Sequence, residues 1–423
     1  MNKYALKSHA KFKSRTEKRV IIGGDTDFCA ERFGYRRGKN GISPAPAFRS
    51  VSPTISADSV LFSEYLPVGS RSFFVLGNGR LMSLNTAAKS PLTLEGTVTT
   101  KFPSVLHTII NNQYYNVIVS GNKLAFIKGT AKATVMTVSV TLKNSVLHCG
   151  RLFGIDDTDE YMLRWSGYAL QNWTEGVDGA GYVRLKPRLG KLLNLFVLGE
   201  KIIIVREAGI SVLSVLGDSR HMRLDVCDKY ELPRVYVNSS AICRGQLWIF
   251  TQKGMRVFDG DSVSVAPVDD FAIGYVLNHA KVVDDRYIYY SAAKGSDKCL
   301  FEYDVETGAC TLFAGGCHSP YFVENNAYAF SGRILGNILP NIEDGNRRWV
   351  SKPVTFDEGK KAVLKSLAVE GSGNFTVETD CDGRKLYSAG AGRFRFAESG
   401  QSFIFRVTGN GSVTSLTAEW EVC

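Results

Sequence analysis

Short runs of apolar residues, separated by turns rich in Gly and Asn, cover most of the chain. Gly77-Asn78-Gly79 between two such runs is a clear example. Gly and Asn accept the backbone angles of tight hairpin turns, and apolar runs of this length are typical of buried strands. The pattern therefore predicts β-hairpins and no amphipathic helix. We expect strand pairs at 71–76 and 80–84, 114–119 and 123–127, 147–153 and 161–165, 193–198 and 201–206, 247–251 and 255–258, and 287–291 and 299–304.

The predicted hairpins recur at intervals of about 35 to 50 residues, which is the period of β-propeller blades. Six units are clear, and a seventh would be built from both ends of the region. The sequence thus predicts an all-β chain with a six- to seven-bladed β-propeller at 59–335. WD dipeptides and the kelch signature are missing, so we do not expect an ordinary cytosolic scaffold propeller.

The pattern changes after Phe330. Residues 331–348 are polar and irregular. In the strand that follows at 401–408, Phe403 and Phe405 alternate with Ile404 and Arg406, which suits a sheet partly covered on both faces. We expect a small C-terminal β-sandwich at 346–423, with strands at 362–370, 374–380, 393–396, 401–408 and 413–422.

Residues 1–58 form a third region, a basic N-terminal arm followed by an extended linker rich in Pro and Ser. Eleven basic and four acidic residues give the first 40 residues a charge of +7, whereas the other 383 residues carry only +3. Basic arms bind polyanions or acidic protein surfaces, and the alternative is a solubilising, disordered terminus. Five aromatic residues among the bases argue against permanent disorder, so we expect the arm to dock on a neighbouring subunit or on its own propeller. The candidate assembly or polyanion-binding residues are Lys3, Lys7, Lys11, Lys13, Arg15, Lys18, Arg19, Arg36 and Arg37, with Phe12, Phe28, Phe33 and Tyr35 as aromatic anchors.

Residue types with catalytic or metal-binding chemistry are present but lack the spacing of a known site. The six histidines show no H-E-x-x-H motif, the nine cysteines no C-x-x-C pair, and no G-x-S-x-G or phosphate-binding loop occurs. Asp156, Asp157, Asp159 and Glu160 could bind calcium, but the rest of an EF-hand loop is missing and a solvated turn is the simpler interpretation. We therefore predict no catalysis, no metal and no cofactor. Sialidase-like propellers are the enzyme alternative, but their repeated S-x-D-x-G-x-x-W boxes are missing.

Two stretches resemble the propellers of phage tails and necks. Residues 151–173 combine a strand, an acidic turn, the tripeptide R-W-S, a short loop and a second Trp, and residues 245–258 form a hairpin pattern around a Gly turn. In these features the chain resembles the nozzle and packaged-DNA stabilisation proteins of short-tailed phages. The small C-terminal domain is similar to accessory sandwiches on some tail propellers and fibres.

The resemblance implies a structural virion protein of the tail or neck, synthesised in the host cytoplasm. Copies would form a homo-oligomeric ring around the DNA channel and help to retain and release packaged DNA. The implied partners are the portal, adaptor or other tail proteins, with non-specific contact to double-stranded DNA. We expect the basic charge in the arm and not in the lumen, because phosphate attraction along the bore would slow ejection. The alternative is a tail-tip or fibre-like adaptor whose propeller binds a host surface glycan. No signal peptide and no apolar run long enough for a membrane span are expected.

Overall fold

The computed structural model describes most of the chain as strands. The described residues are 15–23, 26–27, 29–38, 41–51, 60–67, 69–85, 92–170, 172–216, 223–324, 326–339, 345, 347–356 and 360–422. They contain strands β1 to β39, four short 3-10 helices and no α-helix, so the predicted all-β class is confirmed. No helix within these ranges has the length and apolar character of a membrane span. The chain divides into two compact units, one of residues 48–310 and 314–339, the other of residues 1–47, 311–313 and 340–423.

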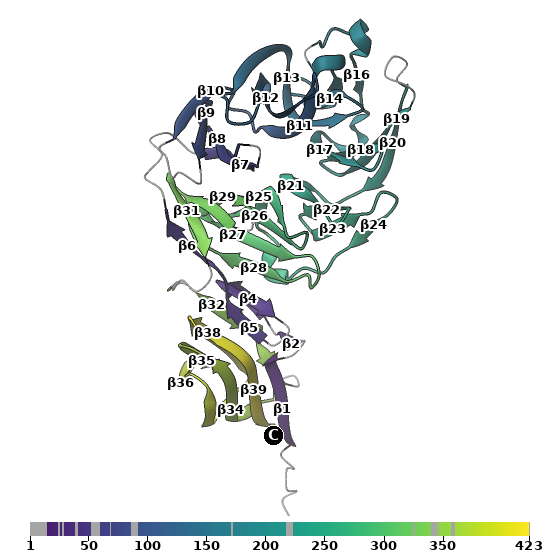
Figure 1. Cartoon of the computed structure of the whole chain (residues 1–423). Coiled ribbons are helices and arrows are strands. Elements are labelled where there is room, and N and C mark those ends of the chain that lie inside the picture. Colours follow the sequence, from purple (N-terminus) through teal and green to yellow (C-terminus); the bar gives the residue numbers. More distant parts are fainter. Residues whose placement is uncertain are drawn as a thin grey trace, which may run out of the picture. The chain divides into compact units, whose positions relative to one another are not determined.

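The larger unit is a succession of antiparallel sheets, and most of them consist of strands that follow one another along the chain (Figure 1). The first two sheets contain β7 (Val60–Leu66), β8 (Arg71–Leu76), β9 (Arg80–Asn85) and β10 (Thr93–Thr97), then β11 (Ser104–Ile110), β12 (Gln113–Ile127), β13 (Thr134–His148), β14 (Arg151–Asp156), β15 (Met162–Trp165) and β16 (Gly181–Arg184). The next two contain β17 (Leu192–Leu198), β18 (Lys201–Arg206), β19 (Gly209–Leu216) and β20 (Arg223–Glu231), then β21 (Val235–Cys243), β22 (Gln246–Thr251), β23 (Gly254–Phe258) and β24 (Val263–Val265). After these come β25 (Val276–Val283), β26 (Tyr287–Lys294) and β27 (Asp297–Asp304), and a last sheet of β29 (Cys317–Val323), β30 (Asn326–Ser331), β31 (Ile334–Leu339) and β6 (Ala47–Ser50). The 3-10 helices η1 (Tyr168–Leu170), η2 (Val177–Gly179), η3 (Pro187–Leu189) and η4 (Asp270–Ala272) lie in the connections.

The sheets of this unit contact one another in a closed order. β13 contacts β17, β17 contacts β21, β21 contacts β25, and β25 contacts β29. The contact between β29 and β7 joins the last sheet to the first. The first sheet packs on the second through a buried cluster that includes Phe73 and Val75 of β8 and Ile118 and Ala125 of β12. A closed ring of antiparallel sheets is a β-propeller, which confirms that part of the prediction.

Local sequence explains most of the hairpins in this unit. Strand β8 is buried along its length, and its turn into β9 uses Gly79 at a φ of 79°, where Asn78 Oδ1 accepts a hydrogen bond from the Arg80 amide at 3.1 Å. A side chain at Gly79 would lie 2.8 Å from the Val98 carbonyl, so both the angle and the space require glycine.

One predicted hairpin is wrong. Residues 114–119 and 123–127 belong to the single strand β12, and Gly121 marks a bulge in that strand where a turn was expected. The neighbouring Ser120 is buried, and its hydroxyl lies 2.8 Å from Thr99 Oγ1. Because this local anchor holds the strand in place, the Ser-Gly-Asn sequence bends the chain without reversing it.

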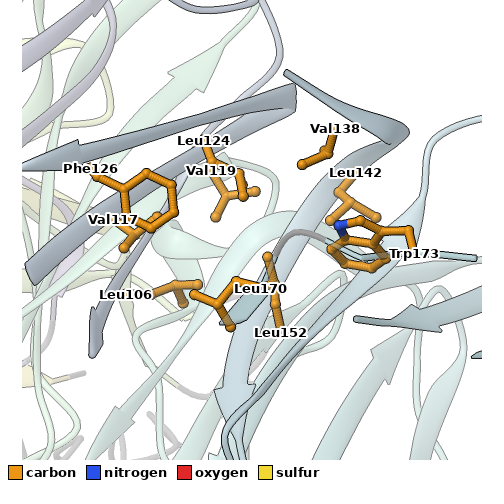
Figure 2. Close-up of a cluster of buried hydrophobic side chains, with 10 residues drawn as sticks. All are labelled: Leu106, Val117, Val119, Leu124, Phe126, Val138, Leu142, Leu152, Leu170 and Trp173. Atoms are coloured by element: carbon orange, nitrogen blue, oxygen red, sulfur yellow. The ribbon is translucent and has the colours of Figure 1, made fainter. Parts of the chain in front are cut away.

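Apolar side chains pack between neighbouring sheets and hold the propeller together. In one such cluster, Phe74 of β8 meets Tyr321 and Phe330 edge-to-face, with ring centroids 5.7 and 5.4 Å apart. Another cluster contains Trp173, which packs with residues of β11 to β14 (Figure 2). Complete burial of one such side chain contributes about 1.5–3 kcal/mol, so these layers supply much of the unit's stability.

The smaller unit combines strands from both ends of the chain. One sheet has the order β2 (Thr26–Asp27), β1 (Arg15–Gly23), β39 (Ser412–Val422), β34 (Ala362–Ser372), β37 (Gly392–Gly400), and β5 (Gly41–Pro44) joins β4 (Tyr35–Gly38) to β39. The other strands have the order β3 (Cys29–Phe33), β32 (Arg348–Ser351), β38 (Ser402–Gly409), β35 (Phe375–Cys381), β36 (Arg384–Ala389), with β33 (Val354–Thr355) on β38 and Leu312 of β28 (Cys310–Phe313) beside Phe33. Trp420 of β39 is fully buried against Phe356, Phe403 and Phe405.

Candidate functional site: the axial cavity

The inner strands of the propeller share a bulge that aims polar side chains toward the axis. The strand register shifts at this level in β7, β13, β17, β21, β25 and β29. Asn238, His279 and Ser319 have positive φ values of 56°, 56° and 51° at corresponding points of β21, β25 and β29. Bulges change the direction in which a side chain points, and Asn and His are among the residues that tolerate positive φ best.

These bulges surround a cavity of about 480 Å³, within the size range of small-ligand sites. Its polar wall contains amides, hydroxyls and one ion pair, and its apolar wall contains aromatic and aliphatic side chains. The polar residues are Glu64, Ser104, His107, Asn144, Ser145, Asn194, Asn238, Ser240, His279 and Lys281, and the larger apolar ones are Phe62, Phe102, Leu106, Leu147 and Phe196.

Three asparagines on successive inner strands have orientations fixed by hydrogen bonds, two of them from backbone amides and one from a neighbouring asparagine. The Leu195 amide donates to Asn144 Oδ1 at 2.8 Å, and the Asn238 amide donates to Asn194 Oδ1 at 3.1 Å. Asn194 Nδ2 in turn donates to Asn238 Oδ1 at 2.9 Å. No described residue accepts a hydrogen bond from Nδ2 of Asn144 or Asn238, so both amides keep free donors at the cavity wall.

The cavity ends at a partition of two stacked rings. The rings of Phe102 and His279 lie 4.9 Å apart and 13° from parallel, and Phe62 meets Phe102 edge-to-face at 5.6 Å. Lys281 forms an ion pair with Glu64 and lies 5.1 Å from the centre of the Phe62 ring. Phe102 and His279 also line a second cavity of about 340 Å³ beyond the partition.

His279 is a neutral structural group at physiological pH. Burial lowers its pKa to about 4, and the charge of Lys281 adds to this effect. Its Nδ1 lies 3.3 Å from Ser291 Oγ and 3.4 Å from Ser319 Oγ. A general base works best when its pKa is near the operating pH, so this Ser–His arrangement does not favour nucleophilic catalysis.

The acidic turn at 156–160 is held by hydrogen bonds and ion pairs. Asp156 is buried and accepts hydrogen bonds from the Thr158 and Asp159 amides and an ion pair from Arg164. Burial opposes ionisation, but the hydrogen bonds from Thr158 and Arg164 outweigh it and lower the pKa of Asp156. The remaining carboxylates pair with cations: Asp157 with Lys101, Asp159 with Arg184, and Glu160 with Lys143 and Lys191. No metal-binding group of three His, Cys, Asp or Glu side chains occurs in the described ranges.

Both tryptophans of the stretch 151–173 have structural roles. Trp165 donates from Nε1 to the Gly179 carbonyl at 2.9 Å and packs on Phe153. Trp173 is 7% exposed and lies in the apolar cluster of Figure 2. These contacts favour a packing role for both rings over a sugar-binding platform.

The described part of the N-terminal arm lies within the smaller unit. Arg15, Lys18 and Arg19 are on β1, which pairs with β39 from Arg15↔Val422 to Ile22↔Leu416. Phe33 is on β3, and Arg36 and Arg37 are on β4. Tyr35 is fully buried and its hydroxyl donates to the Gly409 carbonyl at 2.7 Å, so it anchors the arm to its own chain. Lys3, Lys7, Lys11, Lys13, Phe12 and Phe28 fall outside the described residues.

The region expected to be a linker contains strands. Residues 41–44 form β5 in the smaller unit, and β6 at Ala47–Ser50 closes the last propeller sheet, although residues 52–59 lie outside the described ranges. The smaller unit accordingly includes residues 1–47 as well as the C-terminal residues. The signals that favoured a linker, three prolines and several serines, do not distinguish a loop from a short strand at a sheet edge.

The axial asparagines were not identified from the sequence, although a signal exists. Asn144, Asn194, Asn238 and Asn278 occur at intervals of 50, 44 and 40 residues, once in each successive unit. A polar residue that recurs with the period of the blades marks the axis, because only the inner strands bring equivalent positions together.

Comparisons with known proteins give similarity of structure only. No protein-family model and no curated protein matches the chain. Among solved structures, the β-propeller domain of Myceliophteria thermophila Cps50 (Swd1) is similar at 11% identity over 69% of this chain and 99% of that chain, with a TM-score of 0.48. U3-55K is similar at 9% identity over 70% and 99%, with a TM-score of 0.45. The WD40 β-propeller domain of Doa1 is similar at 9% identity over 70% and 98%, with a TM-score of 0.46.

Proposed function

We propose that the propeller has seven blades. The long strands β12 and β13 each serve two blades: β12 pairs with β11 up to Val119 and with β13 from Gly121, and β13 pairs with β14 from Asn144 onward. Leu106 and Val117 on one side of this bend belong to the same buried cluster as Leu152, Leu170 and Trp173 on the other, as side chains of neighbouring blades do (Figure 2). The closing blade combines β29 to β31 with β6, so it draws on both ends of the propeller region.

We also propose that the smaller unit is a β-sandwich. Trp420 on β39 and Phe403 and Phe405 on β38 belong to different sheets, and their ring centroids lie 6.0 and 6.3 Å apart. Two sheets that bury aromatic residues between their inner faces form a sandwich core.

For the biological role, we propose a non-catalytic structural protein of a phage tail or neck. Copies would form a nozzle ring around the DNA channel, contact the portal or adaptor, and help to retain and release the packaged DNA. The resemblance of residues 151–173 and 245–258 to such propellers suggests the family. Within one propeller the Phe102–His279 partition interrupts the axis, so the proposed DNA path lies between subunits of the ring.

The observation that carries the assembly role is the outer edge of β1. Residues Arg15 to Val20 pair with β39 on one side, and among the described residues β2 covers Ile22 and Gly23 alone on the other side. This edge presents the exposed side chains of Arg15, Lys18 and Val20 next to the basic residues 1–14. An uncovered edge strand is a template for pairing with another chain, and the positive charge would steer it to an acidic surface.

Truncation combined with electron microscopy of particles tests this proposal. Deletion of residues 2–14 keeps β1 intact, so the protein should fold normally but fail to join particles. Full-length protein should appear as an axial ring next to the portal. Normal incorporation of the truncated protein, or its absence from the axis, would contradict the nozzle role.

The alternative role is a tail-tip or fibre-like adaptor that binds a host surface glycan. The amide-lined axial cavity is the observation that supports this alternative. Peripheral spikes in place of an axial ring would support it.

A further inference from the structure

We propose that the axial cavity is a binding site for a neutral sugar of one or two pyranose rings. This inference does not depend on the nozzle role, although it would give the adaptor role its recognition site. Its basis is the cavity wall, which combines oriented hydrogen-bond donors, apolar surface and no net charge.

The donors come from the asparagine chain. Because backbone amides of Leu195 and Asn238 donate to the side-chain oxygens of Asn144 and Asn194, the side-chain amides cannot flip without losing a hydrogen bond. The free Nδ2 groups of Asn144 and Asn238 are therefore donors toward the cavity. A ligand with several oxygen acceptors, such as the hydroxyls and ring oxygen of a sugar, suits them.

Ser145 and Ser240 also line this wall, and both are buried, with 4% and 6% exposed. Their Oγ atoms have no accessible surface and no hydrogen-bond partner in the described structure, so these hydroxyls do not face the cavity. The polar groups offered to a ligand are therefore the side-chain amides.

Charge selects against an ionic ligand. Lys281 and Glu64 neutralise each other as an ion pair. His279 carries no charge at neutral pH, since it is buried beside Lys281. An anion or cation would thus lose its hydration without meeting an unpaired opposite charge.

The apolar wall supplies the rest of the site. Phe102, Leu106, Leu147 and Phe196 line the cavity beside the amides. Sugar-ring C–H faces pack on such side chains while the hydroxyls at the ring edge reach the polar groups. A cavity of about 480 Å³ can hold one or two rings.

Saturation-transfer NMR with the full-length protein tests the proposal. The probes are glucose, galactose, mannose, N-acetylglucosamine and their β-1,4-linked disaccharides, each at millimolar concentration, with glucuronate as the charged comparison. At least one neutral probe should bind more tightly than glucuronate. Asn144→Asp and Asn238→Asp keep the internal hydrogen bonds to Oδ1 but replace the free donor with an acceptor, so each should weaken binding about tenfold.

Two further variants keep the test decisive. Ser240→Ala removes a buried hydroxyl that does not face the cavity and should leave binding unaltered. Asn326→Asp makes the same chemical change as the two cavity variants at an exposed position of β30 and should also leave binding unaltered. The proposal is overturned if no neutral probe binds, if glucuronate binds best, or if the Asn144 and Asn238 variants bind as the unmodified protein does. Since these measurements use isolated protein, their failure is distinct from failure of the nozzle role, which is read from particles.

Discussion

The two units of this protein use the chain in opposite ways. In the propeller, most sheets are built from strands that follow one another, such as β17 to β20. In the smaller unit, β1 pairs with β39 and β3 pairs with β32, so the partners come from opposite ends of the sequence. Bringing distant segments together has a larger entropic cost than closing a hairpin. We therefore expect most of the propeller to be specified by local sequence, and the smaller unit to fold only when both ends of the chain are present.

Removal of β1 should have the largest effect, because it should unfold the smaller unit and leave the propeller folded. Deleting residues 2–23 takes away the buried side chains of Ile21 and Ile22 and leaves one edge of β39 unpaired. The smaller unit should then unfold while the propeller keeps its structure. Limited proteolysis and amide hydrogen exchange would show loss of protection in β34 to β39 only.

The deletion of residues 2–14 is the matched control, because it shortens the arm but keeps β1. It should leave the exchange pattern of the smaller unit unchanged. Full protection of β39 in the longer deletion would mean that the C-terminal strands fold without the N-terminus.

Replacing one tryptophan in each unit with alanine compares how much a single core side chain contributes to the stability of each unit. Trp420→Ala removes a fully buried ring from the smaller unit, and Trp173→Ala removes one from a propeller cluster. Each should destabilise its own unit by about 3–5 kcal/mol, the usual cost of deleting a large core side chain. Scanning calorimetry should show that each variant lowers the transition of the unit that contains it. Trp→Phe at the same positions should cost less, and an equal shift of both transitions by either variant would show that the units do not unfold separately.

This contrast also explains which parts of the structure were predictable. Strands 71–76, 193–198 and 201–206 were predicted almost to the residue, because local turns such as Asn78-Gly79 define them. The pairing of Arg15 with Val422 has no local signal. The charges of β1 led to its interpretation as an arm, although the buried Ile21 and Ile22 show that part of it belongs to a core.

The candidate site was predictable only in part for the same reason. Each axial asparagine occupies an unremarkable place in its own strand, and the site appears only when several inner strands converge. The acidic turn at 156–160 was correctly interpreted as a turn, because Asx and Thr side chains act on neighbouring backbone amides and leave a local signature.

Acidification should weaken the propeller at its axis. The pKa of His279 is about 4 in the folded protein and 6.5 without the fold, so between these values only the unfolded chain takes up the proton. Stability should therefore fall as the pH drops from about 6.5 to about 4, by about 3 kcal/mol in total from this residue.

Denaturant unfolding across this pH range would measure the effect. His148 and His318 act in the same direction, because burial lowers the pKa of both, so the informative quantity is the difference between the unmodified protein and His279→Asn. Asn tolerates the positive φ at this position, and the variant should show a shallower pH dependence. Identical slopes would mean that folding does not lower the pKa of His279.

The smallest expected effect concerns the exposed cations of β1, and it separates folding from assembly. Arg15→Gln and Lys18→Gln change two exposed side chains of β1, a strand that is held by its pairing with β39 and by the buried Ile21 and Ile22. Surface substitutions of this kind alter stability by no more than about 0.5 kcal/mol, so the melting behaviour of the smaller unit should be unchanged.

If the edge of β1 meets an acidic surface in the assembled particle, the same double variant should join particles more slowly and with a weaker dependence on salt. Exchanging Arg384 and Lys385 on β36 for Gln removes the same charge from the same unit and should leave assembly alone. Equal assembly rates for the two double variants would mean that β1 acts in folding alone. A defect confined to the Arg15 and Lys18 variant would mean that β1 also takes part in assembly of the particle.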